Sequence, residues 1–360
     1  MFSYILVGGQ FSDEGGKPSG YIKKLFGAIQ PLCQGKIING GTYSEIQTLI
    51  DNLEFFEVIF WMPDISNDKE KLVKKIKEKY PKAILIISKN NLDSRYPLLE
   101  IVARALSVKA NLFVEFVNPY DNLREIQAGV YDPLGNCFCK SKNINEVAAA
   151  LISRVFELLK FTRVPSIRND NWKISLPSAP EEFFAYVRNH AETFHKLIHA
   201  QGTSRLLGNA SFRCENGFPS FRSGDAIFMS RRNIDKRAID LDGFVQTRLV
   251  SYNKLWVDYV GEHKPSVDAP VQLLLYRYYP KINFILHSHT YIWGGNPTDK
   301  AIPCGAVEEF FEIIKKVPGQ YEDKIFINLK GHGSLAMVSD VKHLKDIPYR
   351  PRPFPEDMGV

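Results

Sequence analysis

Apolar and polar residues form two different patterns along the first 160 residues of the chain. Short apolar runs have strand composition, and they are separated by amphipathic stretches with the period of a helix. The expected strands lie at residues 4–7, 57–61, 83–88 and 110–117, and the expected helices at 44–53, 69–80, 98–105 and 145–159. Strands that alternate with helices form a parallel sheet covered on both faces. The pattern therefore predicts a flavodoxin- or Rossmann-like parallel α/β domain over residues 1–162.

The pattern changes after this domain. Residues 163–179 are rich in Pro, Ser and Asn, which is typical of a linker. A helix is expected over about 180–200, and mostly strand-like segments follow it. We therefore predict a second domain at 180–360, in which one helix is followed by mostly strand-like segments.

The first strand of the N-terminal domain ends at Gly8-Gly9, and a glycine-bearing loop follows it. Ligands of parallel α/β domains bind beyond the carboxyl ends of the strands. This loop matches neither a dinucleotide fingerprint nor a P-loop, because Gly16-Lys17-Pro18 lacks the required Ser or Thr. Two hypotheses stay open: a phosphorylated ligand such as a nucleotide near Gly8, Gly9 and Gly40, or a role in assembly.

Composition narrows the class of protein. The 360 residues are 44% hydrophobic and 24% charged with a net charge of +6, as in soluble globular proteins of two ordinary domains. The densest basic stretch, 69–79, is the solvated face of a helix, so we expect no nucleic-acid partner. No apolar run is long enough to span a membrane, and no signal peptide is recognisable. Five cysteines without framework spacing favour a reducing compartment, and we expect a cytoplasmic protein.

Two histidines one residue apart carry the strongest chemical signal. His287 and His289 follow an apolar run at 282–286, and alternate residues of a strand point to the same side of a sheet. A third histidine, His332, follows another apolar run and lies between Gly331 and Gly333. Three neutral imidazoles with an open position are typical of a catalytic zinc site. Histidines also serve simply as hydrogen-bonding residues, which is the alternative interpretation.

Two polar motifs precede these histidines. Gly208, Asn209 and Ser211 form a turn that offers amide and hydroxyl donors to phosphate oxygens, and Ser266 offers another hydroxyl. Asp268 precedes the histidine strand by one helix, so its carboxylate could bind the metal or carry a proton. Each has a simpler alternative, since such residues also cap turns and helices.

The four motifs together resemble the class II aldolase/adducin family over about residues 180–340. In that family a Gly-Asn-x-Ser turn, a Pro-Ser-x-Glu/Asp segment, a His-x-His and a His-Gly follow one another, and here Pro265, Ser266 and Asp268 stand in the second motif. Asp rather than Glu at 268 is closer to the pentulose-phosphate 4-epimerase branch. The stretch that carries a catalytic carboxylate in those epimerases is missing, and no residue in the sequence is recognisable as its replacement.

Where the family has a Ser/Thr-Gly turn for phosphate, this chain has Ser230, Arg231 and Arg232. Two guanidinium groups could bind a phosphate or carboxylate, or they could lie at a strand end without binding any ligand. We include all three among the candidate substrate-binding residues, together with the turn at 208–211 and Ser266.

The resemblance implies that the second domain is an α/β/α domain with a central, mostly antiparallel sheet. It also implies an aldolase-type lyase that acts on a small hydroxy-carbonyl such as a sugar phosphate. A divalent metal, Zn²⁺ first among the candidates, would be held by His287, His289 and His332 and would stabilise an enediolate, with Asp268 as catalytic residue. Epimerisation and dehydration are alternatives of the same chemistry, and a non-catalytic, adducin-like scaffold is a third. The resemblance also implies a homotetramer, and we see in Tyr276, Tyr278 and Tyr279 either interface aromatics or part of the local core.

Overall fold

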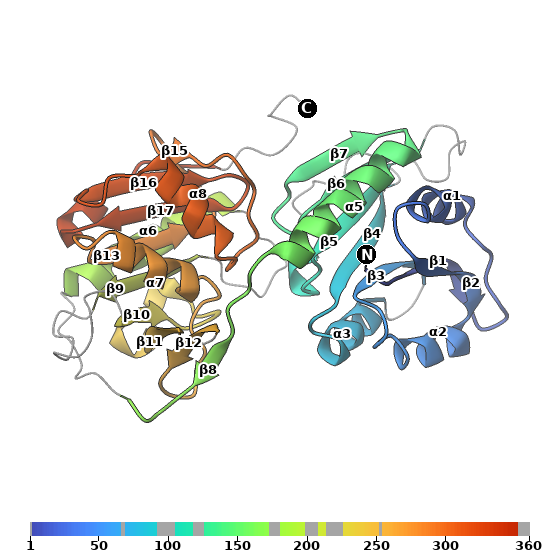
Figure 1. The fold of residues 1–360 in the computed structure, drawn as a ribbon, viewed down its shortest axis with the longest axis horizontal. Helices are drawn as coiled ribbons and strands as arrows, with labels where there is room; N and C mark the ends of the chain where they lie inside the picture. Colours follow the sequence, from blue (N-terminus) through green and yellow to red (C-terminus); the bar gives the residue numbers. More distant parts are fainter. Residues whose placement is uncertain are drawn as a thin grey trace. The chain divides into compact units, whose positions relative to one another are not determined.

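The computed structural model describes residues 2–65, 69–91, 105–117, 126–172, 181–198, 208–213, 226–251 and 254–351, and every structural statement below concerns these residues. They divide into two compact units, with the division between Lys160 and Phe161. Each unit has its own large sheet. Figure 1 labels the elements of both.

The first unit is built on a seven-stranded sheet with the order β2-β1-β3-β4-β5-β6-β7. Neighbours from β2 to β5 pair in parallel, and β6 and β7 extend the sheet as antiparallel strands. The parallel order 2-1-3-4-5 is that of flavodoxin-like folds, which confirms the predicted fold class. The strands are β1 (Tyr4–Ser12), β2 (Gly35–Thr42), β3 (Val58–Asp64), β4 (Ile84–Asn91), β5 (Leu112–Val117), β6 (Gln127–Tyr131) and β7 (Cys137–Ser141).

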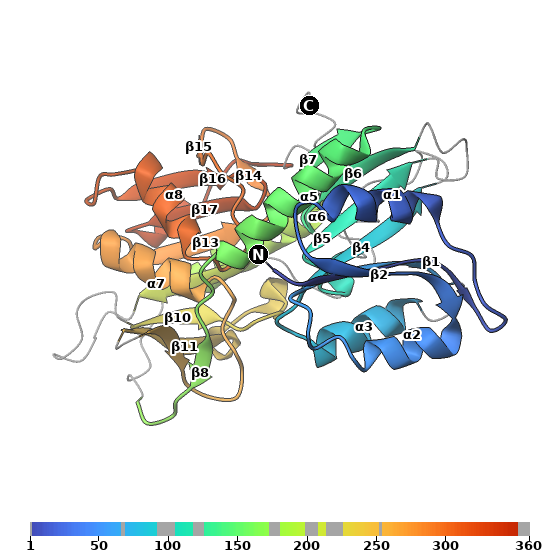
Figure 2. The same ribbon diagram turned by 45° about the vertical axis from the view of Figure 1, so that its right-hand side comes forward.

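Helices cover both faces of this sheet (Figure 2). On one face, α2 (Tyr43–Ile50) and α3 (Lys69–Lys79) bury Ile46, Ile50 and Ile76 against alternate residues of the central strands. On the other face lie α1 (Gly20–Ile29) and α5 (Ile144–Lys160), which pack against each other. The helix expected at 98–105 lies almost wholly outside the described residues.

The second unit is built on a nine-stranded sheet with the order β15-β16-β17-β13-β9-β10-β11-β12-β8. Only the outermost pairs, β15 with β16 and β12 with β8, are parallel. The strands are β8 (Ser166–Arg168), β9 (Asn209–Arg213), β10 (Ala226–Ser230), β11 (Phe244–Ser251), β12 (Leu255–Tyr259), β13 (Phe284–Ser288), β15 (Asn296–Pro297), β16 (Lys324–Leu329) and β17 (Gly333–Val338). A separate pair joins β14 (Tyr291–Ile292) and β18 (Tyr349–Arg350).

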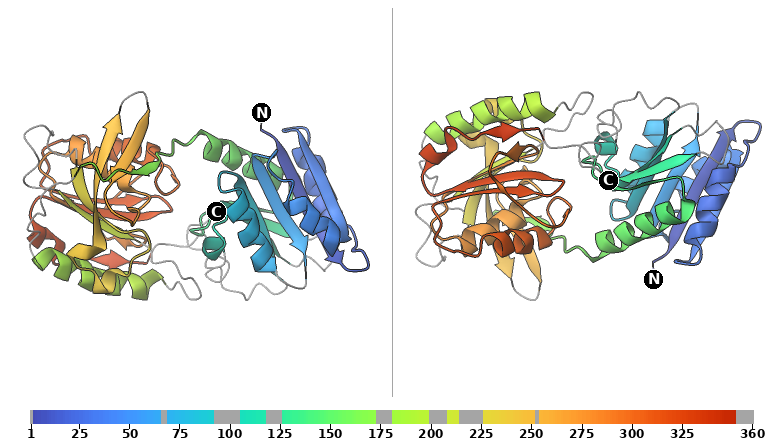
Figure 3. Two further views of the ribbon diagram at one scale, coloured as in Figure 1. Left: turned by 90° about the horizontal axis from the view of Figure 1, so that it is seen from below. Right: turned by 90° about the horizontal axis from the view of Figure 1, so that it is seen from above.

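Helices lie on both faces of the second sheet, as Figure 3 shows. Phe284 and Leu286 of β13 pack on α6 (Glu181–Ile198) in one apolar cluster. Ile285 packs on α7 (Ala269–Tyr278) and α8 (Glu308–Lys316) in another. The predicted α/β/α arrangement with a mostly antiparallel sheet is confirmed. His287 has the parity of Ile285, so its side chain lies on the α7 side of the sheet.

The predicted linker, the tyrosines at 276–279 and the cysteines can also be compared with the structure. Within the segment predicted as a linker, β8 pairs with β12 and so forms an edge of the second sheet. Tyr276 and Tyr279 are fully buried within this one chain, which favours the local core over an interface. Among the described residues no helix is long and apolar enough to cross a membrane, and the described cysteines are free thiols.

Arg213 links α7 to the sheet. Its buried guanidinium donates to the carbonyl oxygens of Tyr276 (2.8 Å), Tyr279 (3.2 Å) and Ile282 (2.9 Å). Hydrogen bonds from a charged group to buried acceptors contribute about 1.5–3 kcal/mol each, and a buried carbonyl left without a donor adds a desolvation cost.

Arg213→Met should therefore lower the free energy of unfolding by about 3 kcal/mol, measured by urea denaturation. Arg237→Met, at an exposed arginine paired with Asp235, is the control and should change little; equal stability of Arg213→Met and the wild type would contradict the assigned role.

Candidate metal centre

The three predicted histidines converge at one end of β13. His287 is in β13 itself, His289 follows the strand directly, and His332 lies in the turn between β16 and β17. One ligand atom from each lies within 4.8 Å of the others, and the ring centroids are 4.6–5.1 Å apart. His287 and His332 are 1% exposed. Among the described residues this is the cluster with the composition and spacing of a metal site.

Two glycines allow the backbones around the site to approach each other closely. Gly333, at φ +155°, starts β17, and a Cβ at this position would lie 1.9 Å from the carbonyl oxygen of Ser288. Gly208, at φ +80°, precedes β9, and its Cβ would lie 2.7 Å from the carbonyl oxygen of His287. Both neighbours of β13 can therefore lie directly against its carboxyl end, which brings His332 and Asn209 to His287.

Hydrogen bonds orient two of the imidazoles for metal binding. Nδ1 of His287 donates to the carbonyl oxygen of Ser334 at 2.9 Å, so its lone pair is on Nε2, which is buried and has no hydrogen-bond partner. Nδ1 of His332 faces Oε1 of Glu309 at 2.6 Å. Metal-binding histidines characteristically use the second ring nitrogen in this way. A buried Nε2 without a partner costs free energy that a cation would recover, so these residues fit a metal ion.

Asp268 lies in the same pocket. It is the N-cap residue of α7, yet its side chain makes no capping hydrogen bond, so the capping alternative does not describe it. Instead Oδ2 accepts from Nδ2 of Asn209 at 2.7 Å and lies 4.0 Å from Nε2 of His287. Oδ1 is buried without a hydrogen-bond partner. The carboxylate is thus held against the three histidines with one oxygen left for a metal, a proton or a substrate.

The other turn residues belong to a buried polar network behind Asp268. Asn209 also donates to Ser266 Oγ (3.1 Å) and accepts from Gln272 Nε2 (2.6 Å). Ser211 is fully buried and bonds to Gln272 and to the hydroxyl of Tyr276. These contacts use the donors that the sequence suggested for phosphate. The phosphate-binding role of Asn209, Ser211 and Ser266 stays a prediction, while their position beside Asp268 is a feature of the fold.

Ser230, Arg231 and Arg232 lie next to the same network. Ser230 is fully buried, and its Oγ accepts from the backbone N–H of Ala210 at 3.1 Å. Arg231 forms a bridge with Pro265, and its Nε is buried without a hydrogen-bond partner. Arg232 is exposed, with Nε donating to the carbonyl oxygen of Pro265 at 3.3 Å. The chain thus places one half-buried and one exposed guanidinium beside Ser266, where their role in anion binding stays a prediction.

Three side chains near the histidines were missed in the sequence. Glu309, in the first turn of α8, is 4% exposed and contacts His332, and Cys304 Sγ lies 3.0 Å from His332 Nε2. Lys236 is 6% exposed and interacts electrostatically with Asp268 and His287. In the sequence Glu309 is one of two adjacent acidic residues opening an amphipathic helix, and Lys236 is one of several basic residues at 231–237. Nothing local distinguishes them from surface charges.

Burial sets the charge state of the site. It lowers the pKa of His287 to about 4, and His332 acts in the same direction, so the His287 imidazole is neutral at pH 7. Burial also lowers the pKa of Lys236 to about 8, against the opposing effect of Asp235 and Asp268. For Glu309, burial raises the pKa and His332 partly offsets it. The pocket therefore combines a neutral His287 imidazole with a lysine whose proton is held less firmly than in water and a glutamic acid whose proton is held more firmly.

Comparison with known proteins identifies this part of the chain. Residues 188–293 match the family model described as "Class II Aldolase and Adducin N-terminal domain". This segment is similar to the class II aldolase/adducin family. It contains Asp268, His287 and His289 but not His332, which lies beyond the matched residues. The resemblance seen in the motifs is thereby confirmed; the closeness to the epimerase branch stays a prediction.

One curated relative is the methylthioribulose-1-phosphate dehydratase of Enterobacter sp. (strain 638), which is 29% identical over 97 residues. The match covers 26% of this chain and 45% of the relative, so it spans less than half of that enzyme.

Two solved structures similar to parts of this chain have low identity. An L-fuculose 1-phosphate aldolase is 17% identical, covering 46% of this chain and 82% of its own, with a TM-score of 0.31. The DNA/pantothenate metabolism flavoprotein from Streptococcus pneumoniae is 9% identical, covering 44% and 100%, with a TM-score of 0.34. The fold assignment therefore rests on the strand orders given above.

Metal content tests the triad directly. The wild-type protein should retain about one divalent ion per chain after dialysis, and His287→Ala and His332→Ala should each lose it, because two imidazoles hold zinc far more weakly than three. Elemental analysis by mass spectrometry gives the stoichiometry. His343→Ala, at an exposed histidine elsewhere in the domain, is the matched control. Wild-type metal content in the two triad variants would show that the site is misassigned.

Proposed function

We propose that the C-terminal domain is a divalent metal-dependent lyase acting on a small hydroxy-carbonyl compound that carries a phosphate or carboxylate. The observation that supports this most directly is the convergence of three imidazoles, two of them oriented by second hydrogen bonds, with a buried carboxylate 4.0 Å from one of them. A scaffold protein has no need of this arrangement. The match of residues 188–293 to the class II aldolase and adducin family model supports an enzyme of the aldolase class.

The residues that would hold the ion are His287, His289 and His332. Three imidazoles favour Zn²⁺, although the same donors suit other transition metals. When bound, such an ion polarises a substrate carbonyl and stabilises the negative charge that develops as a neighbouring bond breaks.

Asp268 is the best-placed group to move a proton. Asn209 and Ser266 direct hydrogen bonds to its Oδ2, which keeps the carboxylate in position, and Oδ1 stays available. We assign Oδ1 as the atom that takes a proton from, or returns one to, the substrate. Glu309 orients His332 through the 2.6 Å contact, and Lys236 supplies a nearby positive charge to an anionic substrate.

Two bond-breaking reactions fit this arrangement. Cleavage of a carbon–carbon bond, as in an aldolase, is the first candidate. Dehydration is the second, and the similarity to a methylthioribulose-1-phosphate dehydratase favours it over epimerisation. In cleavage, Asp268 would take the proton of the hydroxyl group on the carbon that leaves as a carbonyl fragment, and the electron pair of the broken carbon–carbon bond stays on the carbon next to the polarised carbonyl. In dehydration, Asp268 would take the proton from that same carbon, and the hydroxyl group on the neighbouring carbon leaves as water when the proton is returned to it. The same residues therefore serve either reaction.

The reaction can be identified by mass spectrometry of the products formed from L-fuculose 1-phosphate and methylthioribulose 1-phosphate, the sugar phosphates named by two similar proteins. Cleavage gives two fragments, dehydration removes one water, and epimerisation leaves the mass unchanged.

Asp268→Asn should retain the metal and lose about 10²-fold or more in kcat, the usual contribution of a general acid or base. Asp299→Asn, at an exposed carboxylate that pairs with Lys315 and Lys316, is the control. Full turnover by Asp268→Asn would exclude the assigned proton carrier.

Residues 161–360 should be active alone. All the motifs of the site lie within this segment, and the fragment must start before β8 because that strand completes the sheet. We expect the fragment to keep its metal and turnover and, from the family resemblance, to form a homotetramer. Light scattering at micromolar concentration measures the mass. A monomer would contradict the predicted assembly, and a folded fragment that keeps its metal but has no turnover would show that residues 1–160 take part in the reaction.

A further inference from the structure

The first unit contains a cavity that the proposed lyase chemistry does not use. It has a volume of about 350 Å³ and lies at the carboxyl-terminal halves of β1, β3, β4 and β5. The chain leaves β1 through α1 to reach β2 on one side, and β3 pairs with the other side of β1. The cavity therefore lies where the strand order reverses direction, the place where open α/β sheets bind ligands. Its volume falls in the range of small-molecule sites.

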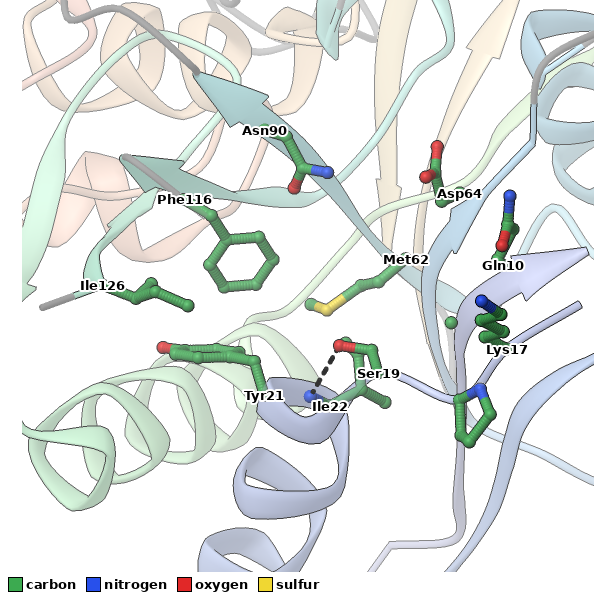
Figure 4. A pocket seen from close by; sticks show the side chains of 12 residues that line it. Gln10, Lys17, Ser19, Tyr21, Ile22, Met62, Asp64, Asn90, Phe116 and Ile126 are labelled. Carbon is green, nitrogen blue, oxygen red and sulfur yellow. Dashed lines mark hydrogen bonds between the residues drawn. The ribbon is translucent and has the colours of Figure 1, made fainter. Parts of the chain in front are cut away.

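One end of the cavity is apolar and aromatic. Met62, Phe116 and Ile126 are 4–5% exposed and line it, and the ring of Tyr21 meets that of Phe116 edge to face at a centroid distance of 4.7 Å. Figure 4 shows Tyr21, Phe116 and Ile126 together at one end, with Met62 between them and the opposite end. A planar ring of a ligand can lie against these side chains and lose its contact with water there.

The other end is polar. Gln10, Lys17 and Asp64 gather there, and Asn90 lies between the two ends (Figure 4). All four are exposed, and none makes a side-chain hydrogen bond or ion pair with any described residue. The backbone of Lys17 is nevertheless fixed, because its carbonyl oxygen accepts from the N–H of Gln10 at 2.8 Å. One ammonium, one carboxylate and two amides thus lie at the rim, where none of them is hydrogen-bonded to another described residue.

The first turn of α1 lies between these ends. Ser19 caps the helix, with Oγ accepting from the N–H of Ile22 at 3.3 Å, and Asn39 holds the backbone of Ser19 by two hydrogen bonds. The amides of Gly20 and Tyr21 have no partner inside the helix. Together with the Lys17 ammonium they offer positive potential to an anionic group.

We propose that this cavity binds a ribonucleoside 5′-phosphate. The base lies against Tyr21, Phe116 and Met62, the sugar hydroxyls donate to Asp64 and Asn90, and the phosphate is held by Lys17 and the start of α1. An inorganic phosphate alone would leave the apolar end empty. A purely apolar ligand would bury Lys17 and Asp64 without partners. The combination of a ring, hydroxyls and an anion satisfies both ends.

Calorimetric titration of the full chain with AMP, GMP, CMP and UMP, and separately with FMN and inorganic phosphate, tests the ligand class. At least one of the four nucleotides should bind with a Kd below ~1 mM and at least about tenfold more tightly than inorganic phosphate, since a tenfold ratio corresponds to 1.4 kcal/mol from the ring. His287→Ala should bind equally well, which separates this result from the proposed metal chemistry. No binding of any of the four nucleotides, affinity no better than for phosphate, or preference for FMN would each overturn the proposal.

Variants test the assigned contacts with the tightest of the four nucleotides. Lys17→Ala should weaken binding about tenfold, whereas Lys24→Ala should not, because Lys24 is an exposed lysine of α1 outside the cavity. The wild type should prefer the ribonucleotide to its 2′,3′-dideoxy analogue, and Asp64→Ala should show a smaller preference, because Asn90 still accepts from a sugar hydroxyl. Both changed side chains are exposed, so folding should be unaffected, which circular dichroism checks. Equal losses in Lys17→Ala and Lys24→Ala, or sugar discrimination in Asp64→Ala as strong as in the wild type, would overturn the assigned pose.

Discussion

Close approach of three backbones at the end of β13 is the constraint on which the candidate metal centre depends. A side chain at Gly208 or Gly333 would collide with the carbonyl oxygens of His287 or Ser288. Without that approach, the turn that carries His332 and the strand that carries Asn209 could not both lie against β13. The histidines therefore owe their proximity to two positions that contribute no chemical group at all.

The same compactness determines the electrostatics. Because His287 is withdrawn from water, its imidazole stays neutral and its Nε2 keeps a lone pair. The network from Ser211 through Gln272 and Asn209 to Asp268 fixes a carboxylate beside it. Oδ1 of Asp268 and Nε2 of His287 are both buried without a hydrogen-bond partner among the described residues. Two such atoms on residues that lie side by side are expected of a site that is formed before its ligand arrives.

Periodicity was enough to predict the parallel α/β class of the first domain, and the family resemblance implied the class of the second. Motif spacing predicted the convergence of His287, His289 and His332, because strand parity and a glycine-flanked turn are local properties. Other features depended on contacts distant in sequence. β2 was missed because Gly35–Thr42 has three glycines and no continuous apolar run. Glu309 and Lys236 have the local context of surface charges, and only tertiary packing buries them. Likewise, that Asp268 does not cap α7 follows from its bond to Asn209, 59 residues away in the chain.

The position of β17 has a consequence for how the domain folds. This strand, Gly333–Val338, follows every other strand of the nine-stranded sheet in the sequence, yet it lies between β13 and β16 in the interior of that sheet. Until it is in place, the strand bearing His287 presents an open edge with unpaired N–H and C=O groups, which can pair with other chains. A nascent chain therefore carries an exposed, largely apolar sheet edge until residue 338 has left the ribosome. Slow translation or premature termination in this region would favour aggregation rather than a partly folded domain.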